Sequence, residues 1–71
     1  MGSGPDLAER LIERRKQLGL RQEDLAVLAG VSERFVRQLE AGKSTVRLDT
    51  LTAVLDALGL ELVLRRREVG R

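Results

Sequence analysis

The chain has 71 residues, of which 34% are charged and 42% hydrophobic, a formal net charge of +2, and neither cysteine nor histidine. Without these two residue types, disulfides, thiolate metal sites and histidine-based catalysis are excluded, so we expect no enzyme, no metal and no cofactor. A domain of this size buries only about 60% of its unfolded surface, which makes a homodimer the expected extra source of stability.

The positive charge is concentrated at one end. Residues 65–71 hold four arginines and one glutamate, a net +3, which leaves −1 for residues 1–64. Any DNA binding must therefore come from the placement of charge on one face. A single phenylalanine argues against stacking platforms for single-stranded nucleic acid. No apolar run approaches the roughly 18 residues of a membrane span, and we expect a cytoplasmic protein without a membrane partner.

The chain is expected to form one folded domain over residues 6–66. Residues 1–5 are predicted to be a disordered N-terminus or an expression remnant, and residues 67–71 a basic tail. Asp6 and Glu9 have the spacing of a capping box and predict the start of a first helix, which Gly19 ends. Its predicted apolar stripe consists of Leu7, Leu11, Ile12 and Leu18.

Residues 22–43 predict two short helices joined by a tight turn at Gly30. Ala26 permits a close helix crossing, and Ser32 is placed as the N-cap of the second of these helices. Arg21 stands at the other N-cap, where a side-chain acceptor would be usual. The apolar stripe of this unit is predicted to contain Leu25, Leu28, Val31, Val36 and Leu39. This pattern predicts a helix-turn-helix.

The second helix of that unit, spanning about residues 32–41, turns polar side chains outward. These are Glu33, Arg34, Arg37 and Gln38, and such long polar side chains can reach base edges. An ordinary solvated helix face is the alternative, but the short preceding helix and the crossing residues favour DNA recognition. Phosphate contacts are predicted for Arg21 and Gln22 at a helix N-terminus and for the loop at Lys43 and Ser44. For Arg21 an ordinary exposed arginine is an equal alternative.

A fourth helix is predicted from Leu48 to Leu58 and is ended by Gly59. Its stripe consists of Leu48, Leu51, Val54, Leu55 and Leu58. Arg47, just before it, could reach the DNA backbone.

The following segment, residues 60–66, alternates like a strand. A lone strand has no partner within a helical chain, so we predict that Leu60, Leu62, Val63 and Leu64 pair with a second copy across a two-fold axis. An extension of the fourth helix and an irregular tail are the alternatives.

The motif RRKQLGLRQEDLAVLAGVSERFVRQLEAGK, followed by VRLDTLTAVLDALGLEL, resembles the Xre-type helix-turn-helix family of lambda-type repressors and Cro proteins. The resemblance covers about residues 7–64, nearly the whole chain. ELVLRRR after DALGL is most similar to HipB-type antitoxins, whose C-terminal strand pairs between protomers. The resemblance implies an all-α, compact four-helix lambda-repressor-like domain with a short C-terminal β-strand.

The resemblance also implies roles for individual residues. The base-reading positions of the family are held here by Ser32, Glu33, Arg34, Arg37 and Gln38. Arg34 and Arg37 could bind guanine and Glu33 could accept from cytosine N4. Gln22 and the loop around Lys43 match phosphate contacts, and Arg15 and Glu40 match a structural ion pair. Relatives usually carry Thr where this chain has Arg21, and smaller residues at Phe35 and Arg37.

The expected function is a homodimeric, sequence-specific repressor of a palindromic operator in double-stranded DNA. The antitoxin of a type II toxin–antitoxin pair, with a HipA-like kinase as the toxin, is the leading hypothesis. The alternatives are a stand-alone Xre-type regulator, a restriction–modification controller, and a protein-interaction module without DNA binding.

Overall fold

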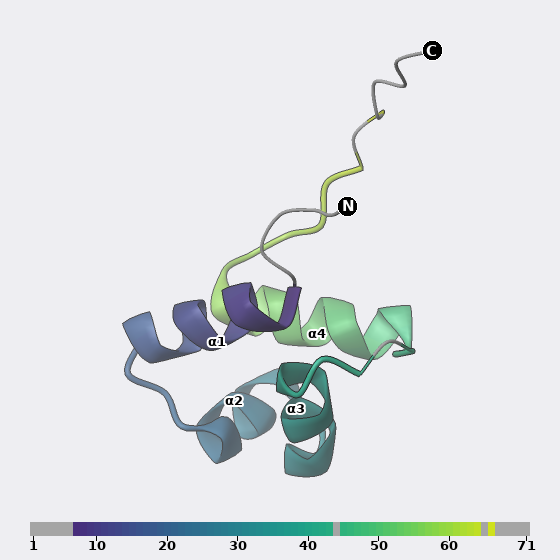
Figure 1. The fold of residues 1–71 in the computed structure, drawn as a ribbon. Coiled ribbons are helices and arrows are strands. Elements are labelled where there is room, and N and C mark those ends of the chain that lie inside the picture. The colour runs from purple at the N-terminus through teal and green to yellow at the C-terminus, as the bar shows by residue number, and fades with distance from the viewer. Residues whose placement is uncertain (1–6, 44, 65, 67–71) are drawn as a thin grey trace.

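The computed structural model describes residues 7–43, 45–64 and 66. This part of the chain contains four helices and no strand: α1 (Leu7–Gln17), α2 (Gln22–Ala29), α3 (Glu33–Glu40) and α4 (Leu48–Leu58) (Figure 1). The prediction of an all-α, four-helix domain is confirmed. The predictions for Asp6, Ser44, residues 1–5 and residues 67–71 lie outside the described residues.

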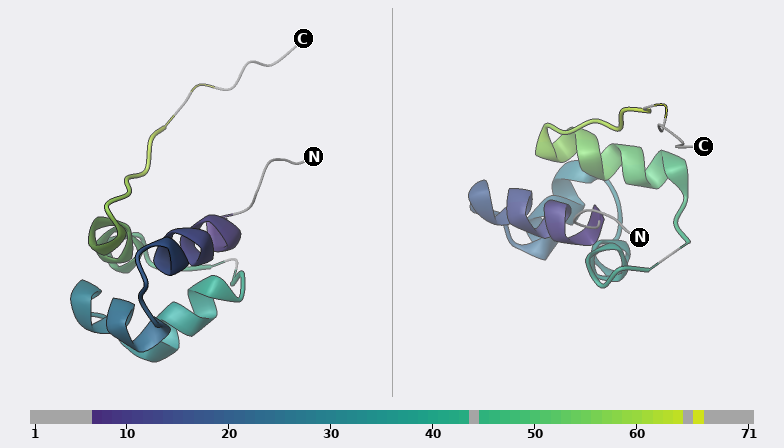
Figure 2. Two further views of the ribbon diagram at one scale, coloured as in Figure 1. Left: turned by 90° about the vertical axis from the view of Figure 1, so that its left-hand side faces the viewer. Right: turned by 45° about the horizontal axis from the view of Figure 1, so that its top comes forward.

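The helices form two layers. In Figure 1, α1 and α4 lie side by side at the top, and α2 and α3 lie beneath them. Contacts join α2 to both α3 and α4, and α1 to both α3 and α4. The two further views show the same arrangement, with residues 60–64 leaving the helical body beyond α4 (Figure 2). The pair α2–α3 therefore lies on one side of the helical domain, and residues 60–64 leave from the opposite side.

The core is built where the apolar stripes of all four helices meet. Its fully buried side chains include Leu11, Leu25, Val36, Val54 and Leu58. Ala26, only 4% exposed, is the small residue in α2 that allows this packing. Among the described residues no polar or charged residue is classed as buried. The core is therefore purely apolar and holds α2 and α3 as one unit.

Within the described residues four glycines, one after each helix, have the left-handed conformation, where a β-carbon would be strained, and two of them end α2 and α4. Gly30 (φ 72°) closes α2, and the Val31 amide then donates to the Ala26 carbonyl at 3.0 Å. Gly59 (φ 72°) closes α4, and the Leu60 amide donates to the Leu55 carbonyl at 2.8 Å. Both glycines thus redirect the chain sharply where the sequence predicted helix ends.

Four leucines of the predicted stripes are not buried. Leu28 is 61% exposed in α2, and Leu48 is 64% exposed at the start of α4. Leu7 at the start of α1 is 38% exposed, and Leu18 just after α1 is 42% exposed. The prediction was wrong for all four, because the neighbouring elements leave these positions open to solvent. Val27, next to Leu28, is 80% exposed. Helical spacing alone does not decide which apolar residue a neighbour covers.

Residues 60–64 leave α4 as an extended segment (Figure 1), and no strand is present among the residues that the structure describes. Leu60 packs against the core, whereas Leu62, Val63 and Leu64 are exposed, Leu64 completely. The predicted strand was one that pairs between two copies, so it stays a prediction. No helix within the described residues is long and apolar enough to cross a membrane.

Candidate nucleic-acid interface

A nearly buried ion pair joins the ends of α1 and α3. Arg15 donates from Nε to Glu40 Oε2 at 2.7 Å and from Nη2 to Glu40 Oε1 at 2.9 Å. Its Nη1 donates to the Leu20 carbonyl at 2.9 Å, in the link that precedes α2. The side chains are 11% and 5% exposed. This bidentate pair is the one that the family resemblance implies, and it ties α1, the link and α3 together.

The pKa of Arg15 is raised, first because Glu40 accepts its hydrogen bond and also because of the carboxylate's charge, although burial opposes the shift. The guanidinium therefore remains charged at any pH at which the protein folds.

Gln22, the first residue of α2, extends this network. Its Nε2 donates to Glu40 Oε1 at 3.0 Å, so this carboxylate oxygen accepts from both Gln22 and Arg15. A glutamine amide nitrogen carries two hydrogens, and only one of them is used here. The bond to Glu40 orients the Gln22 side chain at the N-terminus of α2, and leaves the second hydrogen for another acceptor. Sequence reasoning had assigned Gln22 to phosphate contact and missed this structural bond.

The turn between α2 and α3 is closed by short-range bonds. Ser32 caps α3 by accepting from the Phe35 amide at 3.0 Å, as its position in the sequence predicted. Gly30 provides the left-handed residue before it. The N-terminus of α3 is thereby held at a defined position relative to α2, with Ser32, Glu33 and Arg34 exposed.

The two arginines of α3 are in different states. Arg37 donates from Nη1 to Glu33 Oε2 at 2.9 Å, one helical turn earlier. Arg34 is exposed and makes no hydrogen bond or ion pair within the described part of the chain. Gln38 is half-buried at the edge of the same face. Arg34 can therefore contact a ligand directly. Arg37 can do so only while it keeps its bond to Glu33 or after it gives that bond up.

Two further arginines near this face are also paired with acids close in sequence. Arg21 Nε lies 3.5 Å from Asp24 Oδ2, and Arg47 Nη2 lies 2.7 Å from Asp49 Oδ2. The Arg21 amide donates to Asp24 at 2.8 Å, so Asp24 caps α2 where the Arg21 side chain cannot. Lys43 is exposed and unpaired within the described residues. Of these five cations, only Arg34 and Lys43 have no partner among residues 7–43, 45–64 and 66.

Both aspartates have a lowered pKa. For Asp24 the main cause is the hydrogen bond from the Arg21 amide; for Asp49 it is the bond from the Arg47 side chain, followed by the Thr50 amide. The acids in these pairs therefore stay charged well into the acidic range.

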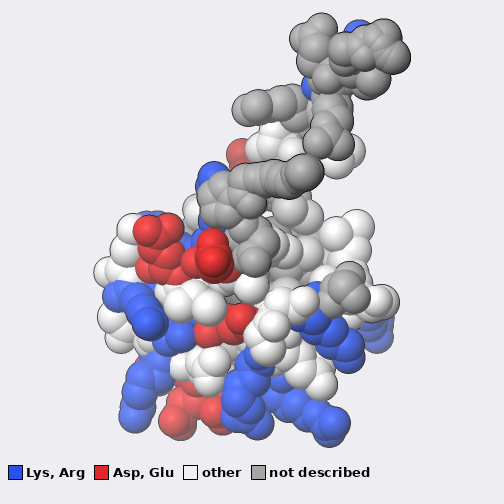
Figure 3. Space-filling model, viewed as in Figure 1, with Lys and Arg blue, Asp and Glu red and all other residues white. Residues whose placement is uncertain are grey.

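Positive and negative side chains are interspersed on this side of the molecule. Figure 3 shows blue side chains along the lower edge of the view, over α2 and α3, with red side chains between them. The pairs formed by Arg21, Arg37 and Arg47 account for such a mixture. The face therefore carries several arginine side chains, but neighbouring aspartate and glutamate side chains neutralise much of their charge.

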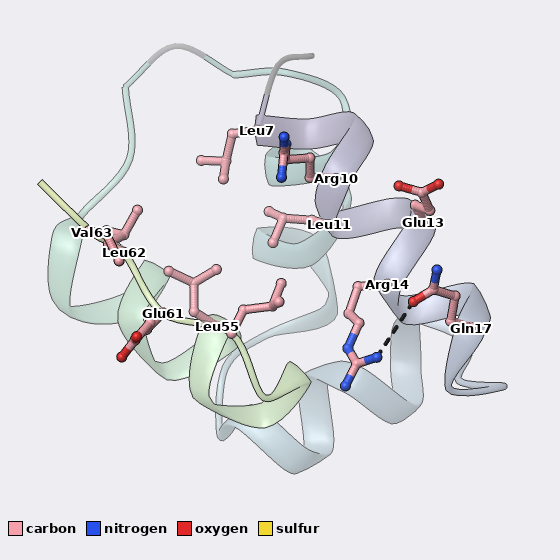
Figure 4. A pocket seen from close by; sticks show the side chains of 11 residues that line it. Leu7, Arg10, Leu11, Glu13, Arg14, Gln17, Leu55, Glu61, Leu62 and Val63 are labelled. Carbon is pink, nitrogen blue, oxygen red and sulfur yellow. Dashed lines mark hydrogen bonds between the residues drawn. The ribbon is translucent and has the colours of Figure 1, made fainter. Parts of the chain in front are cut away.

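The predicted dimerisation residues lie on the opposite side from α3. A groove of about 330 Å³ runs between α1 and the segment after α4, lined by Leu7, Leu11, Leu55 and Leu62 among others (Figure 4). Arg14 borders it and donates from Nε to the Leu58 carbonyl at 2.9 Å. That bond satisfies a carbonyl at the C-terminus of α4 and anchors the point from which the segment departs. This role of Arg14 was not predicted from the sequence.

The family model described as helix-turn-helix (HTH_3) matches residues 11–64. The protein named HigA3 from Mycobacterium tuberculosis, classed by that name as a candidate antitoxin, is 53% identical over 55 residues, which are 75% of this chain and 50% of the relative. The chain spans between 42% and 63% of the length of four curated relatives that it matches.

Solved structures show the same fold. The restriction-modification controller protein C.AhdI from Aeromonas hydrophila has a TM-score of 0.70 and 37% identity, covering 76% of this chain and 82% of the other. A chain of the HipA-HipB-O2-O3 complex has a TM-score of 0.80 and covers 96% of this chain and 100% of the other. Its identity is 22%, so it bears on the fold alone. The predicted likeness to Xre-type and HipB-type folds is confirmed.

Proposed function

The chain belongs to the helix-turn-helix family HTH_3, and from this membership we propose that it is a sequence-specific DNA-binding repressor. We propose further that it is the antitoxin of a toxin–antitoxin pair, autoregulates its operon, and has a kinase of the HipA type as its toxin partner. The named antitoxin relative and the fold shared with a chain of the HipA-HipB-O2-O3 complex support this choice.

One observation carries the DNA-binding proposal. The exposed first turns of α3 place Arg34 and Arg37 on a helix that the Gly30 turn and the Ser32 cap hold in a fixed position. Arginine can donate two parallel bonds to guanine O6 and N7 in the major groove. Glu33 can accept from cytosine N4, and Ser32 and Gln38 border the same face.

Phosphate contacts would fix the orientation of α3 in the groove. Gln22 has one amide hydrogen left and lies at the N-terminus of α2, where the helix dipole favours an anion. Lys43, just beyond the C-terminus of α3, is exposed and has no partner in the part of the chain that the structure describes. Arg21 and Arg47 can join them by releasing their aspartates, since exposed pairs of this kind are weak.

A dimer would place two recognition helices in successive major grooves. We propose that Leu60, Leu62, Val63 and Leu64 form a strand that pairs with the same segment of a second copy. The exposed side chains of Leu62, Val63 and Leu64 support pairing. The backbone groups of these three residues also support it, because they have no partner within the described residues, whereas the Leu60 amide is bonded to the Leu55 carbonyl. The operator should then be a palindrome with half-sites about one helical turn, ~34–36 Å, apart.

Footprinting of the DNA upstream of the gene, repeated at several salt concentrations, tests this function. We expect a protected palindrome, and affinity that falls with salt but remains higher than for scrambled DNA. Equal binding to operator and scrambled duplexes would contradict sequence-specific repression, and no binding would favour a protein-interaction module. A chain ending after Gly59 should sediment as a monomer; an unchanged dimer would rule out the strand.

A restriction–modification controller is a second candidate, favoured by the 37% identity to C.AhdI. The neighbouring gene distinguishes the two. An adjacent kinase-like gene supports the antitoxin, and adjacent restriction and modification genes support the controller.

A further inference from the structure

The bond between Glu33 and Arg37 uses only one edge of the guanidinium. Arg37 donates from Nη1 to Glu33 Oε2 at 2.9 Å, and its Nε and Nη2 have no partner within the described residues. Both side chains are about half exposed, 46% for Glu33 and 55% for Arg37. The free edge, Nε with Nη2, is still able to donate two parallel bonds.

We propose that Glu33 is a specificity-determining residue that acts through Arg37, by favouring contact of this arginine with a base edge over contact with a phosphate. The proposal rests on the DNA-binding function proposed above and assigns a specific role to this one pair. Glu33 is thus a positioning residue for Arg37, in place of a direct reader of cytosine.

The discrimination follows from the charge of the acceptor. A phosphate that binds Arg37 approaches the Glu33 carboxylate, and the two negative charges repel each other. Guanine O6 and N7 are neutral acceptors, so they can bind the free edge while Glu33 keeps the other. On DNA of the wrong sequence, the base edge near Arg37 does not match its two parallel donors, so a phosphate becomes the competing acceptor and the Glu33 carboxylate opposes that contact. Within the described residues Arg34 has no such acid, so it serves as the internal comparison.

The test is to neutralise Glu33 and measure binding to two duplexes. One is the duplex that the wild-type protein selects from a random library, and the other is a random-sequence duplex of equal length. Glu13→Gln is the matched control, because Glu13 is exposed on α1 and borders the groove on the side away from α3. Both variants change the net charge by the same amount, and a thermal melt of each verifies that the domain is folded.

Glu33→Gln frees Arg37 for one additional phosphate contact. On random-sequence DNA, the plot of log affinity against log salt should steepen by about 0.9 per bound chain, which widens the ratio of affinities at 50 mM and 200 mM salt about 3.5-fold. On the selected duplex the change should be smaller, so the ratio of specific to non-specific affinity falls. Glu13→Gln should shift both duplexes alike and leave that ratio unchanged.

The same comparison in an Arg37→Ala background isolates the role of the arginine. There, Glu33→Gln should change the salt slope no more than Glu13→Gln does, because no arginine remains to be released. Equal effects of Glu33→Gln and Glu13→Gln in the wild-type background would overturn the proposal while leaving DNA binding intact. Failure of the wild-type protein to bind either duplex would instead overturn the proposed function, and this inference with it.

Discussion

Two arginine–glutamate pairs within the described residues have the same chemistry in different surroundings. Arg15 and Glu40 are 11% and 5% exposed, and their bonds are bidentate and shared with Gln22 and the Leu20 carbonyl. Arg37 and Glu33 are about half exposed and joined by a single bond within one helix. The buried pair cannot exchange partners without stranding a charge, whereas the exposed pair can exchange with solvent or DNA at little cost. Burial therefore makes one pair structural and leaves the other available for recognition.

Removing the glutamate of each pair should show the largest difference between the two pairs, which is a difference in the free energy of unfolding. Glu40→Gln leaves Arg15 charged and unpaired, and we expect a loss of about 3–5 kcal/mol in the free energy of unfolding. Glu33→Gln should cost less than about 1 kcal/mol, since the exposed pair contributes little. Urea denaturation of both variants measures the difference. Similar losses in the two variants would mean that burial does not separate their roles.

Arg34→Ala and Arg37→Ala compare a free arginine with a paired one on the same helix. Each should weaken binding to the selected duplex by about 1–3 kcal/mol and relax base preference, with little change in stability. Titrations on the selected duplex and on duplexes with single base changes measure both effects. If both variants still discriminate fully between selected and scrambled DNA, these side chains do not read the sequence.

Gln22→Ala tests the residue that links the buried pair to the surface. Loss of its remaining amide hydrogen should weaken binding to all duplexes alike and leave the salt slope unchanged, because a neutral amide displaces no counterion. Lys43→Ala should also weaken binding to all duplexes alike, but it should reduce the salt slope by about 1, because Lys43 is charged. A change in base preference in either variant would contradict a phosphate role.

Acid should lower the stability of the protein only slightly through the exposed pairs Arg21–Asp24 and Arg47–Asp49. The pKa values of Asp24 and Asp49 are lowered in the folded chain, so each adds stability that is present above the unfolded value near 3.8 and is lost as pH falls through the folded value. The melting temperature should fall only slightly over that acidic range. Asp49→Asn should reduce this dependence without removing it, because Asp24 remains; an unchanged profile would contradict a contribution from Asp49.

Most of the candidate site could be predicted because it depends on residues close in sequence. The Ser32 cap, the Gly30 turn and the exposed residues of α3 follow from spacing within a few residues. The Arg15–Glu40 pair came from the family resemblance, since 25 residues separate the partners and no local pattern joins them. The Gln22–Glu40 and Arg14–Leu58 bonds were missed, because each depends on how two distant helices pack.

By itself, the sequence determined where helices begin and end, through caps, glycines and apolar spacing that act within one or two turns. Its resemblance to a known family determined the fold class. Only the tertiary structure decided that Leu28 and Leu48 stay exposed while Leu25 and Leu51 are buried, because coverage depends on the neighbouring helices. It also decided that Arg15 is enclosed and Arg37 is not. Solvent access sets the strength of an ion pair, and it is a property of the packed chain and not of any segment alone.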